Sequence, residues 1–223
     1  MSSPHLIPDW WQSMSAWNFW GDYDAGRWEP GTHQWIEEYV KPGTTYVDVG
    51  AWIGPTVLWA APLAGRVIAL EPDPVAGDML VQNVVEFANV ELVRAALAEE
   101  TGSGQLCPAG RGFGSAMSRL LGAGVPDSCT WDTGGATEVA TITLPDLFDR
   151  YAIDNVSLLK MDIEGGESEV LESVCPFLAE RGIPFIVSMH PGWHNHTVER
   201  AWFDCFTEVI GDLDETAPVL ALP

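Results

Sequence analysis

Apolar runs alternate with segments of helical spacing along most of the chain. Five short runs are apolar at nearly every position and are bounded by Gly, Pro or Asp, as is typical of strands buried on both faces. They are residues 44–50, 66–72, 90–97, 155–162 and 183–190. Segments that begin at Pro55, Pro74 and Glu167 follow three of these runs and have the spacing of helices. The alternation predicts an α/β fold, a mostly parallel central sheet with helices on both faces.

Two segments interrupt this alternation. Residues 101–137 are rich in glycine and have no clear period, so we expect an insertion or a long loop there. An additional strand is expected at 138–144, followed by a short helix from Pro145. Within the last long helical stretch, Pro176 is expected to divide the helix in two, because proline lacks the amide donor that a helix interior requires.

The amino-terminal region is distinguished by its tryptophans. Six of the eleven tryptophans lie within residues 1–43, which show no strong period. We therefore expect residues 1–43 to form a Trp-rich lid or extension and residues 44–223 to form one globular domain. Tryptophans packed on the sheet as ordinary core are the alternative.

Charge and composition limit the partners. A net charge of −22 repels phosphate backbones, so we expect a small-molecule substrate and no nucleic acid. No run of 18 apolar residues occurs and the first residues lack the order of a secretory signal, so we expect no membrane span and a cytoplasmic location. The four cysteines form no CxxC pair and are expected to be reduced thiols. The oligomeric state stays open, a homodimer included.

The first strand ends in a sequence suited to a ligand without phosphate. The segment DVGAWIG begins with an acid, Asp48, and its glycines, Gly50 and Gly54, are four residues apart, unlike the GxGxxG of dinucleotide folds. An acid at a strand end can accept a hydrogen bond from an ammonium group, while glycines let the backbone approach it. Glu71 ends the second strand, where α/β nucleotide sites place a carboxylate for the ribose hydroxyls. A nucleoside joined to an amino acid is S-adenosylmethionine.

Several motifs in chain order then resemble one family. They are YVDVGAWIGP, VIALEPDP, LVQN, TITLPDLFDRY and LLKMDIEGGESEVLES, within roughly residues 28–190. Together they resemble the FkbM-type methyltransferases, class I enzymes that use S-adenosylmethionine and mostly methylate hydroxyls. The resemblance implies a Rossmann-like class I methyltransferase fold.

The resemblance also implies cofactor contacts. Asp48, Gly50 and Gly54 would line the methionine part of the cofactor and Glu71 would hold the ribose. The remaining cofactor-binding positions are Ala95 and Ala96 beside the adenine, Glu29 as an acceptor for the ammonium group, Ser115 in the segment GRGFGSAMS, and Asp162.

Three side chains are candidates for the chemistry. Asp162 ends a central strand, Glu164 lies two residues further on, and His190 follows the strand at 183–190. A hydroxyl acceptor must lose its proton, and we expect His190 to act as a general base near neutral pH, with Asp162 as the alternative base. Glu167 is expected to be part of the charge pattern of its helix.

A metal ion is not expected, although one arrangement is kept as an alternative. His190, His194 and His196 lie within seven residues, but the intervening Pro191 and Gly192 give no regular geometry that would align them. The alternative is Mg²⁺ held by Asp162, Glu164 and His190.

The sequence thus predicts a methyltransferase that uses S-adenosylmethionine to methylate a hydroxyl of a small natural product or sugar. N-methylation of an amine on a small molecule or peptide is the first alternative, and a non-catalytic partner with the cofactor fold is the second. A NAD-dependent oxidoreductase is disfavoured by the lack of GxGxxG.

Overall fold

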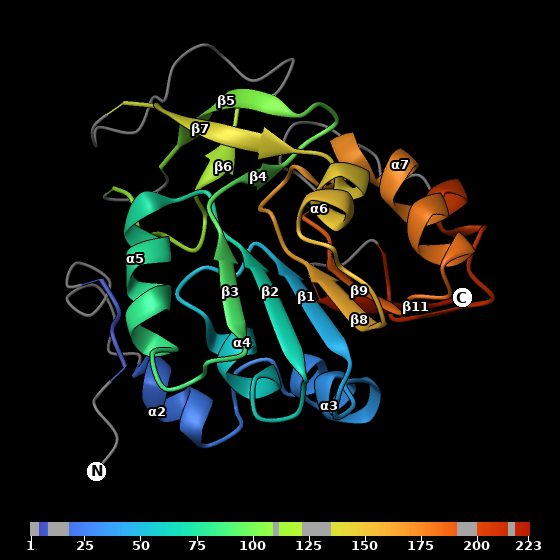
Figure 1. Ribbon diagram of the computed structural model, residues 1–223, viewed down its shortest axis with the longest axis horizontal. Coiled ribbons are helices and arrows are strands. Elements are labelled where there is room, and N and C mark those ends of the chain that lie inside the picture. Colours follow the sequence, from blue (N-terminus) through green and yellow to red (C-terminus); the bar gives the residue numbers. More distant parts are fainter. Residues whose placement is uncertain (1–4, 9–17, 109–111, 122–134, 191–199, 214–216) are drawn as a thin grey trace.

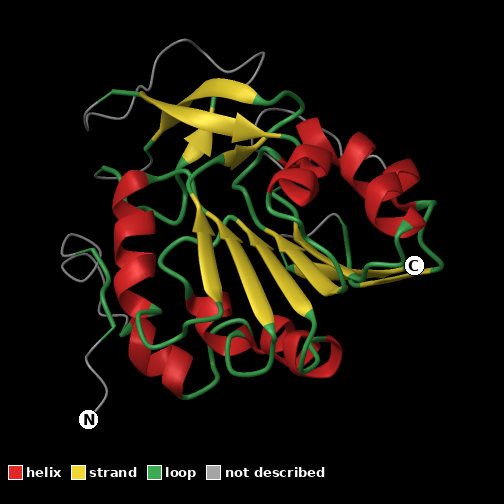
Figure 2. Cartoon of the chain, in the orientation of Figure 1, coloured by secondary structure: helices red, strands yellow, loops and turns green. Residues whose placement is uncertain are grey.

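The protein has two sheets of unequal size, seen in a computed structural model (Figures 1 and 2). The structure describes residues 5–8, 18–108, 112–121, 135–190, 200–213 and 217–223. In spatial order, the larger sheet consists of β10 (Glu208–Ile210), β11 (Pro218–Leu222), β9 (Phe185–Ser188), β8 (Val156–Met161), β1 (Thr45–Val49), β2 (Arg66–Leu70) and β3 (Val90–Val93). The smaller sheet consists of β4 (Ala96–Leu97), β7 (Thr137–Ile142), β5 (Gly102–Cys107) and β6 (Arg119–Leu120).

The order of the larger sheet creates a switch point between β1 and β8. The strands β3, β2, β1, β8 and β9 are parallel, whereas β11 is antiparallel to both β9 and β10. The chain builds outward from β1 to β3 and later returns to the other side of β1 with β8. In open parallel sheets, ligands bind beyond the carboxyl ends of the strands at such a point. The topology therefore indicates where a site should be sought.

Helices cover both faces of the larger sheet (Figure 1). Alternate residues of β2 show why, because Val67 and Ala69 belong to one hydrophobic cluster and Ile68 and Leu70 to the other. The first cluster includes residues of α2 (Phe19–Asp24), α3 (Pro30–Tyr39), α4 (Pro55–Ala60) and α5 (Pro74–Asn83). The second includes residues of α6 (Leu144–Arg150), α7 (Glu167–Glu180) and the short 3₁₀ helix η1 (Arg200–Phe203). The predicted α/β class and Rossmann-like arrangement are confirmed.

The smaller sheet lies beyond the carboxyl ends of β1, β2 and β3, at the top of Figure 1. It contains the strand expected at 138–144, which the structure places at Thr137–Ile142. Within the predicted insertion or long loop at 101–137, Gly102–Cys107 and Arg119–Leu120 pair as strands, so only the long-loop alternative is wrong for these residues. Glycine allows this pairing at Gly104, where an added Cβ would lie 3.0 Å from Leu120. These strands are partly exposed and contain few apolar residues, so the hydrophobic pattern of the sequence did not predict them.

Two further predictions need correction. Pro176 does not divide the last long helix, because α7 continues from Glu167 to Glu180. Pro176 cannot donate a hydrogen bond to the carbonyl of Glu172. Both residues are exposed, so water can replace the missing hydrogen bond. Cys107 is disulfide-bonded, so the prediction of four reduced thiols is wrong. Cys175 and Cys205 are free thiols.

The described part of the Trp-rich region packs onto the domain. Phe19 is buried and its ring lies 5.1 Å from that of Trp52, while Trp20 and Trp28 cover the same cluster. Trp10, Trp11 and Trp17 lie outside the described residues. The role of residues 1–43 as a lid stays a prediction. No helix in the described ranges has the length and hydropathy of a membrane span.

Candidate active site

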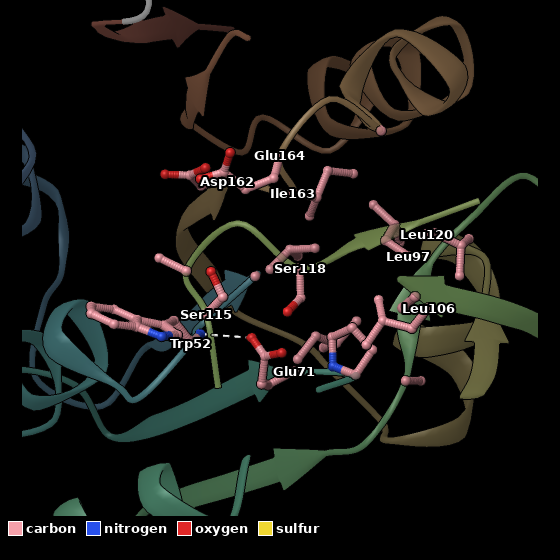
Figure 3. Close-up of a pocket in the computed structure, with 18 of the residues that line it drawn as sticks. Trp52, Glu71, Leu97, Leu106, Ser115, Ser118, Leu120, Asp162, Ile163 and Glu164 are labelled. Carbon is pink, nitrogen blue, oxygen red and sulfur yellow. Dashed lines mark hydrogen bonds between the residues drawn. The ribbon is translucent and has the colours of Figure 1, made fainter. Parts of the chain in front are cut away.

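Two adjoining pockets lie at the carboxyl ends of β1, β2 and β8. The first, about 640 Å³ with its open mouth, extends from Glu71 to the smaller sheet (Figure 3). The second, about 760 Å³, reaches the aromatic side chains of Phe19 and Trp28. Five residues line both pockets: Gly50, Trp52, Ala116, Asp162 and Glu164. The shared residues define the junction between the two pockets.

Glu71 is fixed at the floor of the first pocket. Its Oε2 accepts a hydrogen bond from the backbone N–H of Trp52 at 2.7 Å, drawn as the dashed line in Figure 3. Its Oε1 accepts from the backbone N–H of Asp73 at 2.8 Å. These bonds hold both carboxylate oxygens at the end of β2 and leave each of them lone pairs for a ligand. Burial raises the pKa of Glu71 to about 8, an effect that the two backbone donors only partly oppose.

Glu71→Gln should flatten the dependence of stability on pH. Because folding raises the pKa of Glu71 from 4.5 to about 8, the folded state keeps a proton that the unfolded state loses between these values. The contribution of Glu71 to stability therefore falls as pH rises through this window. We measure the free energy of unfolding in urea at pH 5.5 and at pH 8.5. Between these pH values, we expect it to fall on the order of 2 kcal/mol more in wild type than in Glu71→Gln. Equal losses in the two proteins would contradict this assignment.

The backbone after β1 passes unusually close to β8. Gly50 has φ +78°, and a Cβ added there would lie 1.8 Å from the carbonyl oxygen of Asp162. The N–H of Asp162 also donates to the carbonyl of Val49 at 2.9 Å. Trp52, at φ +49°, then turns its indole Nε1 to the carbonyl of Gly114 at 2.9 Å. Only glycine fits at position 50, and the resulting turn brings both strand ends to the junction.

Asp48 lies beneath the pockets and lines neither of them. Its side chain is 0% exposed and faces the layer between the sheet and α4, where it accepts a hydrogen bond from the hydroxyl of Thr56. Lys160 lies directly opposite Asp48 on β8, with 3.4 Å between Nζ and Oδ1. Burial disfavours the charge of Lys160, but Asp48, Asp162 and Glu29 outweigh it and raise the pKa of Lys160. Asp48 thus positions a buried ammonium group that lines the second pocket.

Glu29, which immediately precedes α3, faces the same ammonium group. It precedes the helix with φ +41°, a rare conformation for this residue type, and makes no capping bond. Its Oε2 is buried without a hydrogen-bond partner. Burial raises the pKa of Glu29 to about 7, and Lys160 opposes this shift. The second pocket therefore contains an acceptor and a cation that a zwitterionic ligand could engage together.

The predicted Gly/Ser segment is tied to the start of α5. Asp73 caps that helix by accepting from the N–H groups of Val75 and Ala76, and its other oxygen accepts from Gly114 N–H and the Ser118 hydroxyl, both at 2.7 Å. This contact places Ser115 and Ser118 in the wall of the first pocket, as Figure 3 shows.

Acids and a histidine gather at the junction. His190 Nε2 lies 3.6 Å from Asp162 Oδ1 and 3.6 Å from Glu164 Oε2. On its other side, His190 Nδ1 hydrogen-bonds to Glu167 at 3.0 Å. Burial and the neighbouring Asp162 raise the pKa of Glu164 to about 7. The expected charge-pattern role of Glu167 is wrong, because its side chain is 1% exposed and holds this cluster together.

The surroundings of His190 bear on its role as a base near neutral pH, which stays a prediction. Burial disfavours its charged form, but the hydrogen bond from His190 to Glu167 and the charges of Glu167, Asp162 and Glu164 raise its pKa to about 9. The raised pKa favours the protonated ring when no cation lies beside it, and the protonated ring has no free lone pair to accept a proton. Among the predicted catalytic residues, Asp162 and Glu164 line both pockets, whereas His190 lies behind them.

The predicted cofactor-binding residues divide into three groups. Lining the first pocket are Gly50, Glu71, Ala95, Ala96, Ser115 and Asp162. Glu29 lines only the second pocket. Asp48 and Gly54 line neither, since Gly54 lies where an added Cβ would be 3.2 Å from Leu80 of α5. His194 and His196 lie outside the described residues.

Sequence reasoning missed four residues of the site: Trp52, Asp73, Lys160 and Glu167. One signal was available, because Lys160 is one of only two lysines and stands inside an otherwise apolar strand. A buried lysine needs acidic partners, so its position already pointed to Asp48 and Asp162.

Sheet order and binding edge together define a Rossmann-like α/β fold with a site at the carboxyl ends of its strands. Residues 48–207 match the sequence profile described as the methyltransferase FkbM domain. The chain therefore belongs to the FkbM methyltransferase family, as the sequence predicted.

Solved structures agree with this fold. The methyltransferase FkbM from Methylobacillus flagellatus KT superimposes with a TM-score of 0.52 at 16% identity, over 86% of this chain and 50% of that one. The present chain thus spans half the length of that protein. Fibrillarin from Aeropyrum pernix, with natively bound S-adenosyl-L-methionine, gives a TM-score of 0.51 at 12% identity, over 89% of this chain and 75% of that one. No curated protein sequence matches the chain.

Proposed function

We propose that this protein transfers a methyl group from S-adenosylmethionine to a hydroxyl of a small natural product or sugar. The observation that carries the proposal is the pair of adjoining pockets that share Asp162 and Glu164. The first pocket has polar groups suited to a nucleoside, and the second combines an acid and an ammonium group, suited to an amino acid, with aromatic rings. S-adenosylmethionine supplies an electrophilic methyl group on a positively charged sulfur.

The residues present fit this cofactor. Glu71 holds two carboxylate oxygens at the end of β2, where they can accept hydrogen bonds from both ribose hydroxyls. Ala95 and Ala96 give the first pocket an apolar wall suited to an adenine ring. At the amino-acid end, the unpartnered Oε2 of Glu29 can accept from an ammonium group while Lys160 faces a carboxylate. These contacts would hold the cofactor across the switch point.

The acceptor would enter from the second pocket. Phe19, Trp28 and Trp52 line it and offer flat apolar faces for a sugar ring or another flat molecule. The net charge of −22 disfavours an RNA or DNA acceptor, whose phosphates the surface would repel. Asp162 lies at the junction of the two pockets, so its carboxylate is placed to take the proton of the acceptor hydroxyl.

Glu71→Ala tests the cofactor assignment. The substitution removes the acceptors for two hydroxyls, so affinity for S-adenosylhomocysteine should fall about 10- to 100-fold by calorimetry, or about 1.4–2.7 kcal/mol. Glu91→Ala is the matched control, because Glu91 is an exposed acid on β3 that pairs with Arg66 away from the pockets. Equal affinity in the Glu71 variant and wild type would refute the ribose contact.

The acceptor assignment needs a separate screen. Purified protein is incubated with methyl-labelled S-adenosylmethionine and matched pairs of hydroxylated and amine-bearing glycosides, polyketides and peptides. We expect label to transfer only to members that carry a hydroxyl. Transfer confined to the amine members would establish N-methylation instead.

A further inference from the structure

Three atoms of the kind that bind metal ions converge at the junction of the two pockets. They are His190 Nε2, Asp162 Oδ1 and Glu164 Oε2, and the ligand atoms of these residues lie within 4.8 Å of one another. Nε2 is 3.6 Å from each of the two oxygens, which is too far for a hydrogen bond. Asp162 Oδ1 is buried and has no hydrogen-bond partner. Groups that would satisfy one another directly would lie closer.

The spacing of His190 Nε2 from each carboxylate oxygen fits a cation between nitrogen and oxygen ligands. A divalent transition-metal ion lies about 2.0–2.2 Å from nitrogen and oxygen ligands, which places neighbouring ligands roughly 3.0–3.6 Å apart in octahedral or tetrahedral geometry. The two distances of 3.6 Å are at the upper end of this range. A small adjustment of either carboxylate would complete the coordination.

Glu167 orients this ligand set. Its Oε1 is 3.0 Å from His190 Nδ1, so that Nε2 points at the two other carboxylates. The same carboxylate accepts from the N–H groups of Ile163 and Gly165, on either side of Glu164, at 3.0 and 2.8 Å. A histidine that ligates a metal commonly donates its other N–H to a carboxylate in this way. When His190 donates its Nδ1–H to Glu167, the Nε2 of the neutral ring carries a lone pair that faces Asp162 and Glu164. This lone pair and the two carboxylates repel one another, and a cation between them would remove that repulsion.

We propose that Asp162, Glu164 and His190 form a divalent-cation site, with Glu167 as the residue that positions it. The binding of the cation rests on this geometry, whereas its catalytic role rests on the proposed function. Since Asp162 and Glu164 line both pockets, a cation held there faces the acceptor hydroxyl and lowers its pKa. The hydroxyl proton passes to the second oxygen of Asp162 and the hydroxyl oxygen bonds to the methyl carbon. The carbon–sulfur bond breaks with its electron pair staying on sulfur.

The ligand types favour a transition metal. One imidazole and two carboxylates suit Mn²⁺ or Zn²⁺, whereas Mg²⁺ favours oxygen ligands. The magnesium identity considered from the sequence is therefore replaced by a transition-metal ion, and Mn²⁺ is the probe of choice because free Mn²⁺ gives a direct electron paramagnetic resonance signal.

The test is a Mn²⁺ titration of the full chain, followed by this signal in about 0.2 M KCl to suppress loose binding to the acidic surface. We expect one site per chain that Zn²⁺ displaces more effectively than Mg²⁺. His190→Ala and Glu164→Gln should each weaken it at least 10-fold. Glu167→Gln should weaken it about 10-fold through loss of orientation. Asp78→Asn is the control, since Asp78 is an exposed acid that pairs with Arg94.

The outcomes separate the inference from the proposed function. Equal Mn²⁺ binding by wild type, His190→Ala and Glu164→Gln would overturn the site, and so would the absence of a stoichiometric site in wild type. The absence of a stoichiometric site would mean that a proton on His190, and not a metal ion, holds the two carboxylates together. Binding of S-adenosylhomocysteine is measured on the same samples, and its failure would refute the proposed function without changing the metal result. Circular dichroism of both variants confirms that they fold.

Discussion

Gly50→Ala is expected to destabilise the protein by about 3–5 kcal/mol, among the larger effects of a single substitution. The new Cβ would lie 1.8 Å from the carbonyl oxygen of Asp162, a backbone atom that cannot turn aside like a flexible side chain. Relief requires β1 and β8 to move apart, which also strains the bond from Asp162 N–H to the carbonyl of Val49. Because Gly50 lines both pockets, the same movement should abolish binding of S-adenosylhomocysteine.

Gly182→Ala is the matched control for this experiment. Gly182 follows α7 with φ +64°, close to the +78° of Gly50, but an added Cβ there meets nothing within 4 Å. It should cost only the penalty of left-handed backbone, about 1–2 kcal/mol, and leave cofactor affinity unchanged. Urea unfolding of the two variants separates the steric effect from the conformational one. Similar losses of stability in both would show that the close approach of β1 and β8 is not rigid.

The positions of the strands could be predicted because they are buried on both faces. Such strands read as continuous apolar runs, and the acids that end them, Glu71 and Asp162, stand out against that background. Parallel strands bring these ends to one edge of a sheet, so the location of the site followed from topology alone. Asp48, predicted as a cofactor contact, lies one residue inside the strand end, where its side chain is buried and lines neither pocket.

Contacts between distant segments could not be read from the chain. The indole of Trp52 is held by a hydrogen bond to the carbonyl of Gly114, 62 residues away. Glu167 hydrogen-bonds to His190, 23 residues away. Neither pairing has a periodic signature, because each depends on how loops meet after the sheet is formed. The strands of the smaller sheet escaped for a different reason, since Gly102–Cys107 is half exposed and lacks the apolar run that marks a buried strand.

The charge of the site also depended on tertiary structure. The sequence shows an acidic protein but not that Glu29, Asp48 and Asp162 surround one buried ammonium group, Lys160. Asp48 lies opposite Lys160 in the register of β1 and β8, whereas Glu29 comes from a helix that precedes the sheet in the chain. Lys160 therefore compensates three acids at once.

Lys160→Met is expected to lower stability by about 3–5 kcal/mol, the range for removing one partner of a buried ion pair. Methionine has a similar length but carries no charge, so Asp48 would remain 0% exposed without a cation beside it. The double variant Lys160→Met with Asp48→Asn should recover part of this loss, because it removes the uncompensated charge as well.

Lys41→Met supplies the comparison, since Lys41 is the only other lysine in the sequence and its ammonium group is exposed, bonded to the carbonyl of Glu38. That variant should stay within about 0.5 kcal/mol of wild type in urea unfolding at pH 7. Affinity for S-adenosylhomocysteine should fall only in the Lys160 variants, because Lys160 lines the second pocket and Lys41 lies away from it. If Lys160→Met were as stable as Lys41→Met, Asp48 would have to be uncharged in the folded protein, and Lys160 would have no structural role beneath the site.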